Sequence, residues 1–178
     1  MWRSYYEHQP VRLYLQLVEL LRKQYQLPFW RASVGGYHAA RAAVVFQRGH
    51  SRAEYEQALP DLVAYYALIR RSSDIAFSVE SVARSELEWW IIHRERARHA
   101  DGDLERSLAA LQAAIYQRPE SFFRDHARAR AEAMLLRDAA AEQSGVSEQQ
   151  WKRIASLLDH SWVSLQAAIL DPLATRKP

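Results

Sequence analysis

The chain has 178 residues, which suits one globular domain, and its composition is 49% hydrophobic and 25% charged. It contains no cysteine, so disulfides, zinc–thiolate sites and cysteine nucleophiles are excluded. The net charge of +3 is spread along the chain rather than concentrated in a basic stripe. Charge alone therefore does not indicate nucleic-acid binding, although nucleic acid is not excluded as a partner.

The start of the chain, MWRSYYEHQP, lacks the apolar core of a signal peptide. No run approaches the roughly 18 apolar residues of a transmembrane helix. We therefore expect a cytoplasmic protein with no membrane partner.

Apolar residues recur with the helical period in every long segment, and no segment alternates as a half-buried strand would. The expected fold is therefore all-α: one domain over residues 1–178, built as a bundle of about six to eight helices. We expect the tail from about residue 171 to be frayed and disordered.

The first helix is expected from about Pro10 to Gln26, before the break at Leu27-Pro28. Its expected core-facing stripe is Val11, Leu15, Val18, Leu21 and Tyr25, widened by Leu13, Leu17 and Leu20. The second helix is expected from about Phe29 to Arg48. It is apolar on nearly all sides, and Gly35-Gly36 allows neighbours to approach closely, so we expect it to be the central, most buried helix.

Capping signals and prolines place the remaining helices. Ser51 and Glu54 have capping-box spacing, and Pro60 is expected to kink or split the helix that follows, leaving 61–71 as a second piece. Later helices are expected at 79–99, 104–117, 119–143 and, after a cap at Ser147, up to about Leu170. The last of these has an expected core stripe of Trp151, Ile154, Leu158, Trp162, Leu165 and Ile169.

The segment VESVARSELEWWIIHRERARH, residues 79–99, is the strongest candidate for a functional site. Drawn as a helix at about 100° per residue, it places Glu86 and His93 on the same apolar face as Trp89 and Trp90. A carboxylate and an imidazole in such surroundings need partners, because burying them bare costs several kcal/mol. We take Glu86 and His93 as catalytic acid/base candidates.

Two other helices also turn ionisable groups toward apolar surface. We therefore expect a pocket between the second, fourth and sixth helices that binds a small anionic or aromatic ligand, with or without acid/base chemistry. Its expected ligand-binding residues are Trp89, Trp90, His38, Arg41, His126, Arg130 and Arg137. The alternative is purely structural: Glu86 pairs with Arg130 or Arg41, and His93 bonds a carbonyl or a tyrosine. No cofactor is indicated.

A metal site is a second alternative, because Glu86, His93, His38 and His126 are chemically adequate ligands. The spacing argues against it, since the chain has no Glu-x-x-His of the kind that di-iron bundles use. We therefore assign no metal ligand. A haem held by His93 is a less favoured variant.

Residues 31–49, RASVGGYHAARAAVVFQRG, contain an aromatic-His-Ala-Ala-Arg-Ala run followed by apolar residues and glycine. This segment resembles a helix of HEPN-domain proteins. The resemblance implies an all-helical, commonly dimeric fold and a metal-independent ribonuclease with an Arg-x4–6-His motif. Here Arg31 and His38 are separated by six residues, and Arg94 and His99 by four.

A further alternative is an interaction or assembly module, in which an exposed apolar edge serves a homodimer or a larger assembly. The broad apolar faces of the first two helices favour it. A homo-oligomer therefore stands beside a small molecule among the expected partners.

Overall fold

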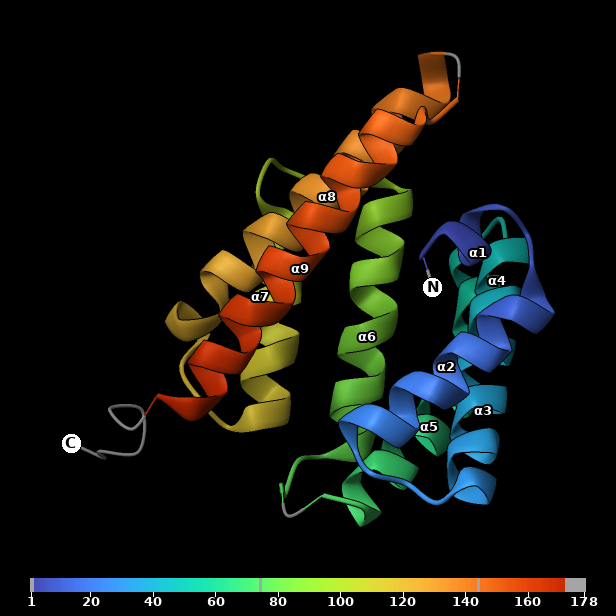
Figure 1. Cartoon of the computed structure of the whole chain (residues 1–178), viewed down its shortest axis with the longest axis vertical. Coiled ribbons are helices and arrows are strands. Elements are labelled where there is room, and N and C mark those ends of the chain that lie inside the picture. Colours follow the sequence, from blue (N-terminus) through green and yellow to red (C-terminus); the bar gives the residue numbers. More distant parts are fainter. Residues whose placement is uncertain (1, 74, 144, 172–178) are drawn as a thin grey trace. The chain divides into compact units, whose positions relative to one another are not determined.

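The computed structural model describes residues 2–73, 75–143 and 145–171, and within these ranges the chain forms helices and short 3₁₀ turns without a strand (Figure 1). The predicted all-α fold class is therefore confirmed. None of the helices in this part of the chain has both the length and the apolarity to cross a membrane.

The chain divides into two compact units, Met1–Ile91 and Ile92–Pro178, with the boundary inside one helix. The helices that begin in the first unit are α1 (Trp2–Tyr6), α2 (Pro10–Gln24), α3 (Phe29–Arg48), α4 (Arg52–Tyr55), α5 (Leu59–Arg71) and α6 (Val79–Arg94). Those of the second unit are α7 (Asp103–Tyr116), α8 (Arg124–Gln143) and α9 (Glu148–Leu170). The single domain expected from chain length stays a prediction.

In the first unit, α2 packs along α3, as the glycine pair predicts. A Cβ atom added at Gly36 would lie 2.8 Å from Val18 Cγ2, and one added at Gly35 would lie 2.8 Å from Leu21 Cδ1. Such distances are shorter than van der Waals contact, so the missing side chains let the two helices approach. α3 also contacts α5, but its predicted place at the centre of the whole chain stays a prediction.

The predicted core stripe of α2 is partly wrong. Leu13, Leu17, Val18 and Leu21 are buried, whereas Val11 is 71% and Leu15 59% exposed. The helix is therefore rotated so that one edge of the predicted stripe faces outward. The helix has leucine or valine on most of its circumference, so the hydrophobic pattern alone does not determine which side is buried.

Three other expected boundaries are also corrected. The helix after Ser51 breaks into a 3₁₀ turn at Glu56–Ala58, and Pro60 lies in the first turn of α5, where a missing N–H is tolerated. α6 ends at Arg94 and is followed by a 3₁₀ turn at Arg96–Arg98, rather than continuing to residue 99. The helix expected from residue 119 starts with a 3₁₀ turn at Glu120–Phe123, and α8 itself begins at Arg124. The short α1 was not expected at all.

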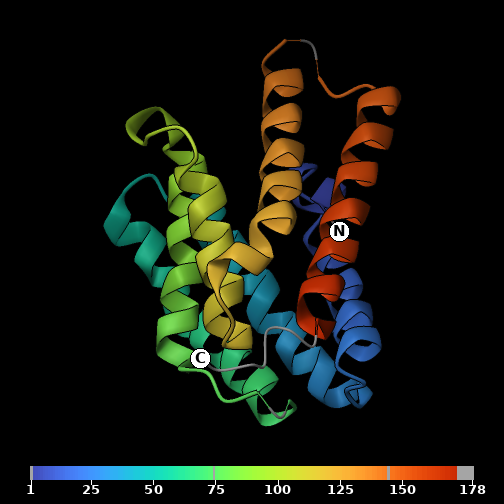
Figure 2. The same ribbon diagram turned by 90° about the vertical axis from the view of Figure 1, so that its left-hand side faces the viewer.

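The second unit is built on a hairpin of α8 and α9, which lie side by side in Figures 1 and 2. Ser147 and Gln150 form the predicted capping box at the start of α9. Arg118 caps the C-terminal end of α9: its guanidinium donates hydrogen bonds to the carbonyls of Ala168 and Asp171, at 3.0 and 2.8 Å. The chain after Asp171, where we expected a frayed tail, lies outside the described residues.

The core stripe predicted for α9 is partly correct. Ile154 and Leu165 are buried as expected, but Trp162 is exposed and Leu157 and Ser161 take part in the buried face instead. The true face is displaced by a fraction of a turn from the predicted one.

Candidate functional site

Glu86 lies half-buried on α6, and its two carboxylate oxygens accept hydrogen bonds from neighbouring aromatic side chains. The Tyr66 hydroxyl donates to Oε2 at 2.8 Å, and the Trp90 indole N–H donates to Oε1 at 3.0 Å. Burial, together with the negative charge of Glu86, raises the pKa of Tyr66 well above its ordinary value. Tyr66 therefore stays a neutral donor, and these three residues form an internally satisfied cluster.

His93, by contrast, belongs to an ion-pair cluster in the second unit. Its Nε2 lies 3.0 Å from Asp138 Oδ2. Arg96 Nη1 lies 3.3 Å from the same oxygen, and Arg137 Nη1 lies 3.0 Å from Oδ1. Burial opposes ionisation of Asp138, but His93 and Arg137 outweigh it and lower its pKa.

His126 is buried on α8 and is anchored to α9. Its Nδ1 lies 3.0 Å from the Ser161 carbonyl and 2.8 Å from the Ser161 hydroxyl. Burial, reinforced by the positive charge of Arg130, lowers the pKa of His126 from 6.5 to about 4, although the bond to the carbonyl opposes the shift. The imidazole is therefore neutral near pH 7, and its Nδ1–H donates to the carbonyl.

His38 and Arg41 on α3 share the buried carboxylate of Asp61 on α5. His38 Nδ1 lies 2.8 Å from Asp61 Oδ1, and Arg41 Nε lies 3.3 Å from Oδ2. The sequence analysis singled out His38 and Arg41 but missed Asp61, which is only 5% exposed. An acid directly after Pro60 looks like an ordinary helix-start residue, so no local signal marked it.

Glu86, His38 and Arg41 thus have partners within the first unit, and His93 and His126 have partners within the second. The Nε2 atom of His126 is buried without a hydrogen bond among the described residues. Glu86 accepts hydrogen bonds from Tyr66 and Trp90, and Trp89 contacts Trp90 edge-on, with ring centroids 6.1 Å apart. The described residues contain no group of three His, Asp or Glu side chains placed to hold a metal ion. The predicted small-ligand pocket stays a prediction.

The HEPN-like motifs differ in their local structure. Arg31 and His38 lie two turns apart on α3, and the Arg31 guanidinium lies 5.0 Å from the Trp30 ring centroid. Arg94 and His99 are not on one continuous helix, because α6 ends between them, and His99 Nδ1 lies 3.8 Å from Asp103.

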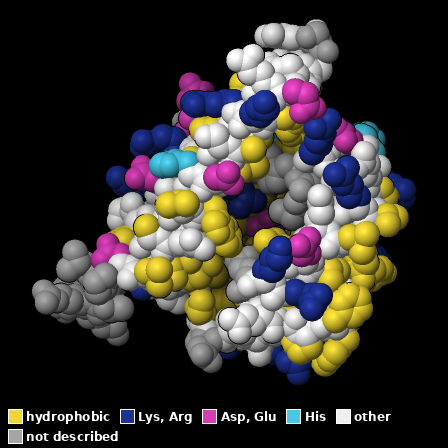
Figure 3. Space-filling view, viewed as in Figure 1, with side chains coloured by type: hydrophobic (Ala, Val, Ile, Leu, Met, Phe, Trp, Pro, Cys, Tyr) yellow, Lys and Arg dark blue, Asp and Glu magenta, His cyan; other side chains and the backbone are white. Residues whose placement is uncertain are grey.

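The exposed side of the α2–α3 hairpin carries a feature that the sequence analysis assigned to the core. Six large apolar side chains are 46–71% exposed there: Val11, Leu15, Phe29, Trp30, Val34 and Tyr37. We call this set the outer face. Trp30, Val34 and Tyr37 follow one another at helical spacing on α3, and Figure 3 shows hydrophobic side chains gathered over α2 and α3.

The same hairpin is strongly basic, so the positive charge is not spread evenly along the chain as we expected. Residues 10–48 contain six Arg or Lys and a single acidic residue, Glu19. The six basic side chains are all exposed: Arg12, Arg22, Lys23, Arg31, Arg41 and Arg48. The Arg22 guanidinium of α2 lies 5.9 Å from the Phe29 ring centroid of α3, so charge and aromatic surface meet across the two helices.

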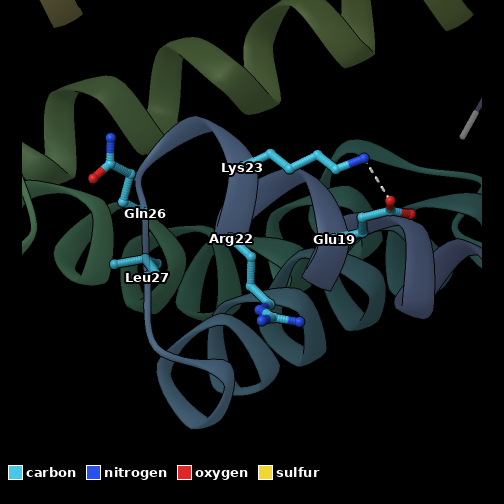
Figure 4. A pocket seen from close by; sticks show the side chains of 5 residues that line it. All are labelled: Glu19, Arg22, Lys23, Gln26 and Leu27. Carbon is cyan, nitrogen blue, oxygen red and sulfur yellow. Dashed lines mark ion pairs between the residues drawn. The ribbon is translucent and has the colours of Figure 1, made fainter.

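An open pocket of about 470 Å³ lies at the end of α2, beside the outer face (Figure 4). Its lining residues are Glu19, Arg22, Lys23, Gln26 and Leu27. Lys23 Nζ is paired with Glu19 Oε1 at 2.7 Å, whereas Arg22 turns toward Phe29. None of the predicted site residues lines this pocket, so it is a feature of the basic hairpin.

Comparison with known proteins finds no relative: no family model, no curated protein and no solved structure matches the chain. The HEPN resemblance therefore rests on its short motif alone.

Proposed function

We propose that the protein is a helical interaction module that docks a macromolecular partner through the outer face of the α2–α3 hairpin. The observation that carries this proposal is the exposure of six large apolar side chains on two adjacent helices. Single exposed apolar residues are ordinary, but a cluster of them is typical of an interaction site.

The composition of the surface supports the same conclusion. Trp30, Tyr37 and the arginines beside them are the residue types that contribute most binding energy at protein interfaces. Aromatic rings offer a large contact area and lose little side-chain entropy when they are covered.

The interior candidates support a functional role less well than the outer face does. Glu86 has two donors, His93 faces a carboxylate, and His126 bonds Ser161. Each of these side chains therefore has a partner within the protein, although the Nε2 atom of His126 is buried without a hydrogen bond among the described residues.

Site-specific photo-crosslinking in the cells that make the protein tests the proposal. A photoreactive residue placed at Leu15 or Trp30 is expected to form adducts with a protein, nucleic acid or lipid, identified by mass spectrometry. Matched controls are Lys152 and Ser156, which are exposed on α9. Adducts that form equally at the control positions, or at none of the four, would overturn the proposal.

A further inference from the structure

We infer that the partner of the outer face is the surface of an anionic lipid bilayer, an inference that rests on the proposed docking function. The hairpin would lie in the plane of the membrane interface and would not span it. The inference therefore departs from the expectation of no membrane partner, which rested on the lack of a signal peptide and of a long apolar run. Such docking requires an exposed apolar helix face together with a positively charged surround.

The apolar part of the surface has the required geometry. Val11 and Leu15 are one turn apart on α2, and Trp30, Val34 and Tyr37 follow i, i+4, i+7 spacing on α3. All five are exposed on helices that pack against each other. Tryptophan and tyrosine favour the headgroup region because their rings are apolar and carry one polar group.

The charges complement a layer of lipid phosphates and carboxylates. Six basic side chains are exposed; Lys23 pairs with Glu19 and Arg41 pairs with Asp61 of α5, and the other four, Arg12, Arg22, Arg31 and Arg48, face no acidic residue of the hairpin besides Glu19. The guanidinium groups of Arg22 and Arg31 lie over exposed rings, at 5.9 and 5.0 Å from the centroids. Long arginine side chains can keep such contacts to apolar surface while their charged ends reach the headgroups.

Other occupants fit these observations less well. A second copy docked through the same face would bring two strongly basic surfaces together, with only Glu19 on each side to offset them. Single-stranded RNA could stack on Trp30 or Tyr37, but it offers nothing that gains from contact with Val11, Leu15 and Val34. A bilayer interface accommodates the aliphatic, aromatic and cationic groups together.

Flotation of the full chain with lipid vesicles tests the inference. We expect binding to vesicles of mixed phosphatidylserine and phosphatidylcholine, loss of binding as salt is raised, and little binding to pure phosphatidylcholine. The double variant Phe29→Ser/Trp30→Ser should weaken association about tenfold or more. Trp162→Ser, which removes an exposed tryptophan of α9, is the matched control and should bind like the parent.

A second pair of variants tests the charges. Arg22→Gln/Arg31→Gln should weaken binding to anionic vesicles several-fold, whereas Arg128→Gln/Arg153→Gln on α8 and α9 should not. Circular dichroism and thermal melting of every variant show whether it is folded. Since all the substituted side chains are exposed, parent-like melting is expected.

Failure of the lipid inference differs from failure of the docking function. The lipid assignment is overturned if the chain does not bind vesicles, or if the outer-face and control variants lose vesicle binding equally. Protein adducts at Trp30 in cells would still support the proposed docking function. A dimer mass in solution that Phe29→Ser/Trp30→Ser abolishes would assign the face to a second copy. If the chain binds a partner in the absence of vesicles and single-stranded RNA competes for that binding, the outer face would be assigned to nucleic acid.

Discussion

The α2–α3 hairpin and the α8–α9 hairpin each consist of two packed helices, and each carries six Arg or Lys side chains. They differ in acidic residues: residues 10–48 contain one, whereas residues 124–170 contain six. In the second hairpin the charges pair, as in Arg153 with Glu132 at 3.2 Å and Arg137 with Asp138 at 3.0 Å. Because its charges are paired within the hairpin, this surface gains less from binding a partner of opposite charge.

The exposed apolar side chains of the two hairpins also differ. The second hairpin exposes Leu135, Trp162, Val163 and Leu170, of which one is aromatic. The first exposes six, of which three are aromatic, and two of these have an arginine over the ring. A larger exposed apolar area and an excess of basic over acidic residues therefore distinguish α2–α3 from α8–α9, and they support the docking role proposed for it.

The largest difference in the free energy of unfolding is expected between substitutions on the buried side and on the exposed side of α2. Leu21→Ala removes a fully buried side chain and should lower the free energy of unfolding by about 2–5 kcal/mol. Leu15→Ala, the same change on the outer face, should stay within about 0.5 kcal/mol. Denaturant unfolding of both variants measures the difference, and a large loss in Leu15→Ala would place the outer face in the core.

The stability that depends on the His126–Ser161 contact between α8 and α9 should decrease in acid. Because burial lowers the pKa of His126 to about 4 while the unfolded chain has a value near 6.5, protons bind preferentially to the unfolded chain. The stability it contributes is complete above about pH 6.5 and is lost as pH falls toward 4. The loss should be on the order of 2–3 kcal/mol.

Urea unfolding between pH 7 and 4 measures this slope. His126→Asn should flatten it, whereas His160→Asn, at an exposed position of α9, should leave it unchanged. Equal slopes in the parent and His126→Asn would show that the contact of His126 with Ser161 does not link stability to pH.

Two tyrosines compare the contribution of a buried and of an exposed hydroxyl to the stability of the first unit. Tyr66→Phe removes a donor to the half-buried Glu86 carboxylate and should cost about 1–3 kcal/mol. Tyr37→Phe removes the hydroxyl of an outer-face residue and should cost less than about 0.5 kcal/mol. Thermal or denaturant unfolding distinguishes the two, and equal costs would contradict the assignment of Glu86 to a structural cluster.

Local sequence signals predicted the ends of several elements. Pro28 and Gly49 bound α3 at Phe29–Arg48, and the capping box of Ser147 and Gln150 begins α9. These signals act within a few residues, so the surrounding fold changes them little.

The orientation of helix faces and the partners of buried polar groups could not be predicted in the same way. Val11 and Leu15 were assigned to the core because α2 has apolar residues on nearly every side, and the choice depends on the fit to Gly35 and Gly36. The bonds of Asp61 to His38 and of Tyr66 to Glu86 join residues 23 and 20 positions apart on different helices. Such pairings follow from packing between helices rather than from spacing along one of them.

The smallest expected change in stability is also the one that bears most directly on the comparison of the hairpins. Phe29→Ser/Trp30→Ser removes two exposed rings from α3, and Trp162→Ser removes one from α9, so both should unfold within about 0.5 kcal/mol of the parent. If the outer face serves a partner, only the first variant should lose binding. A marked loss of stability in that variant would instead mean that Phe29 and Trp30 support the fold, and the surface would then have no need of a partner.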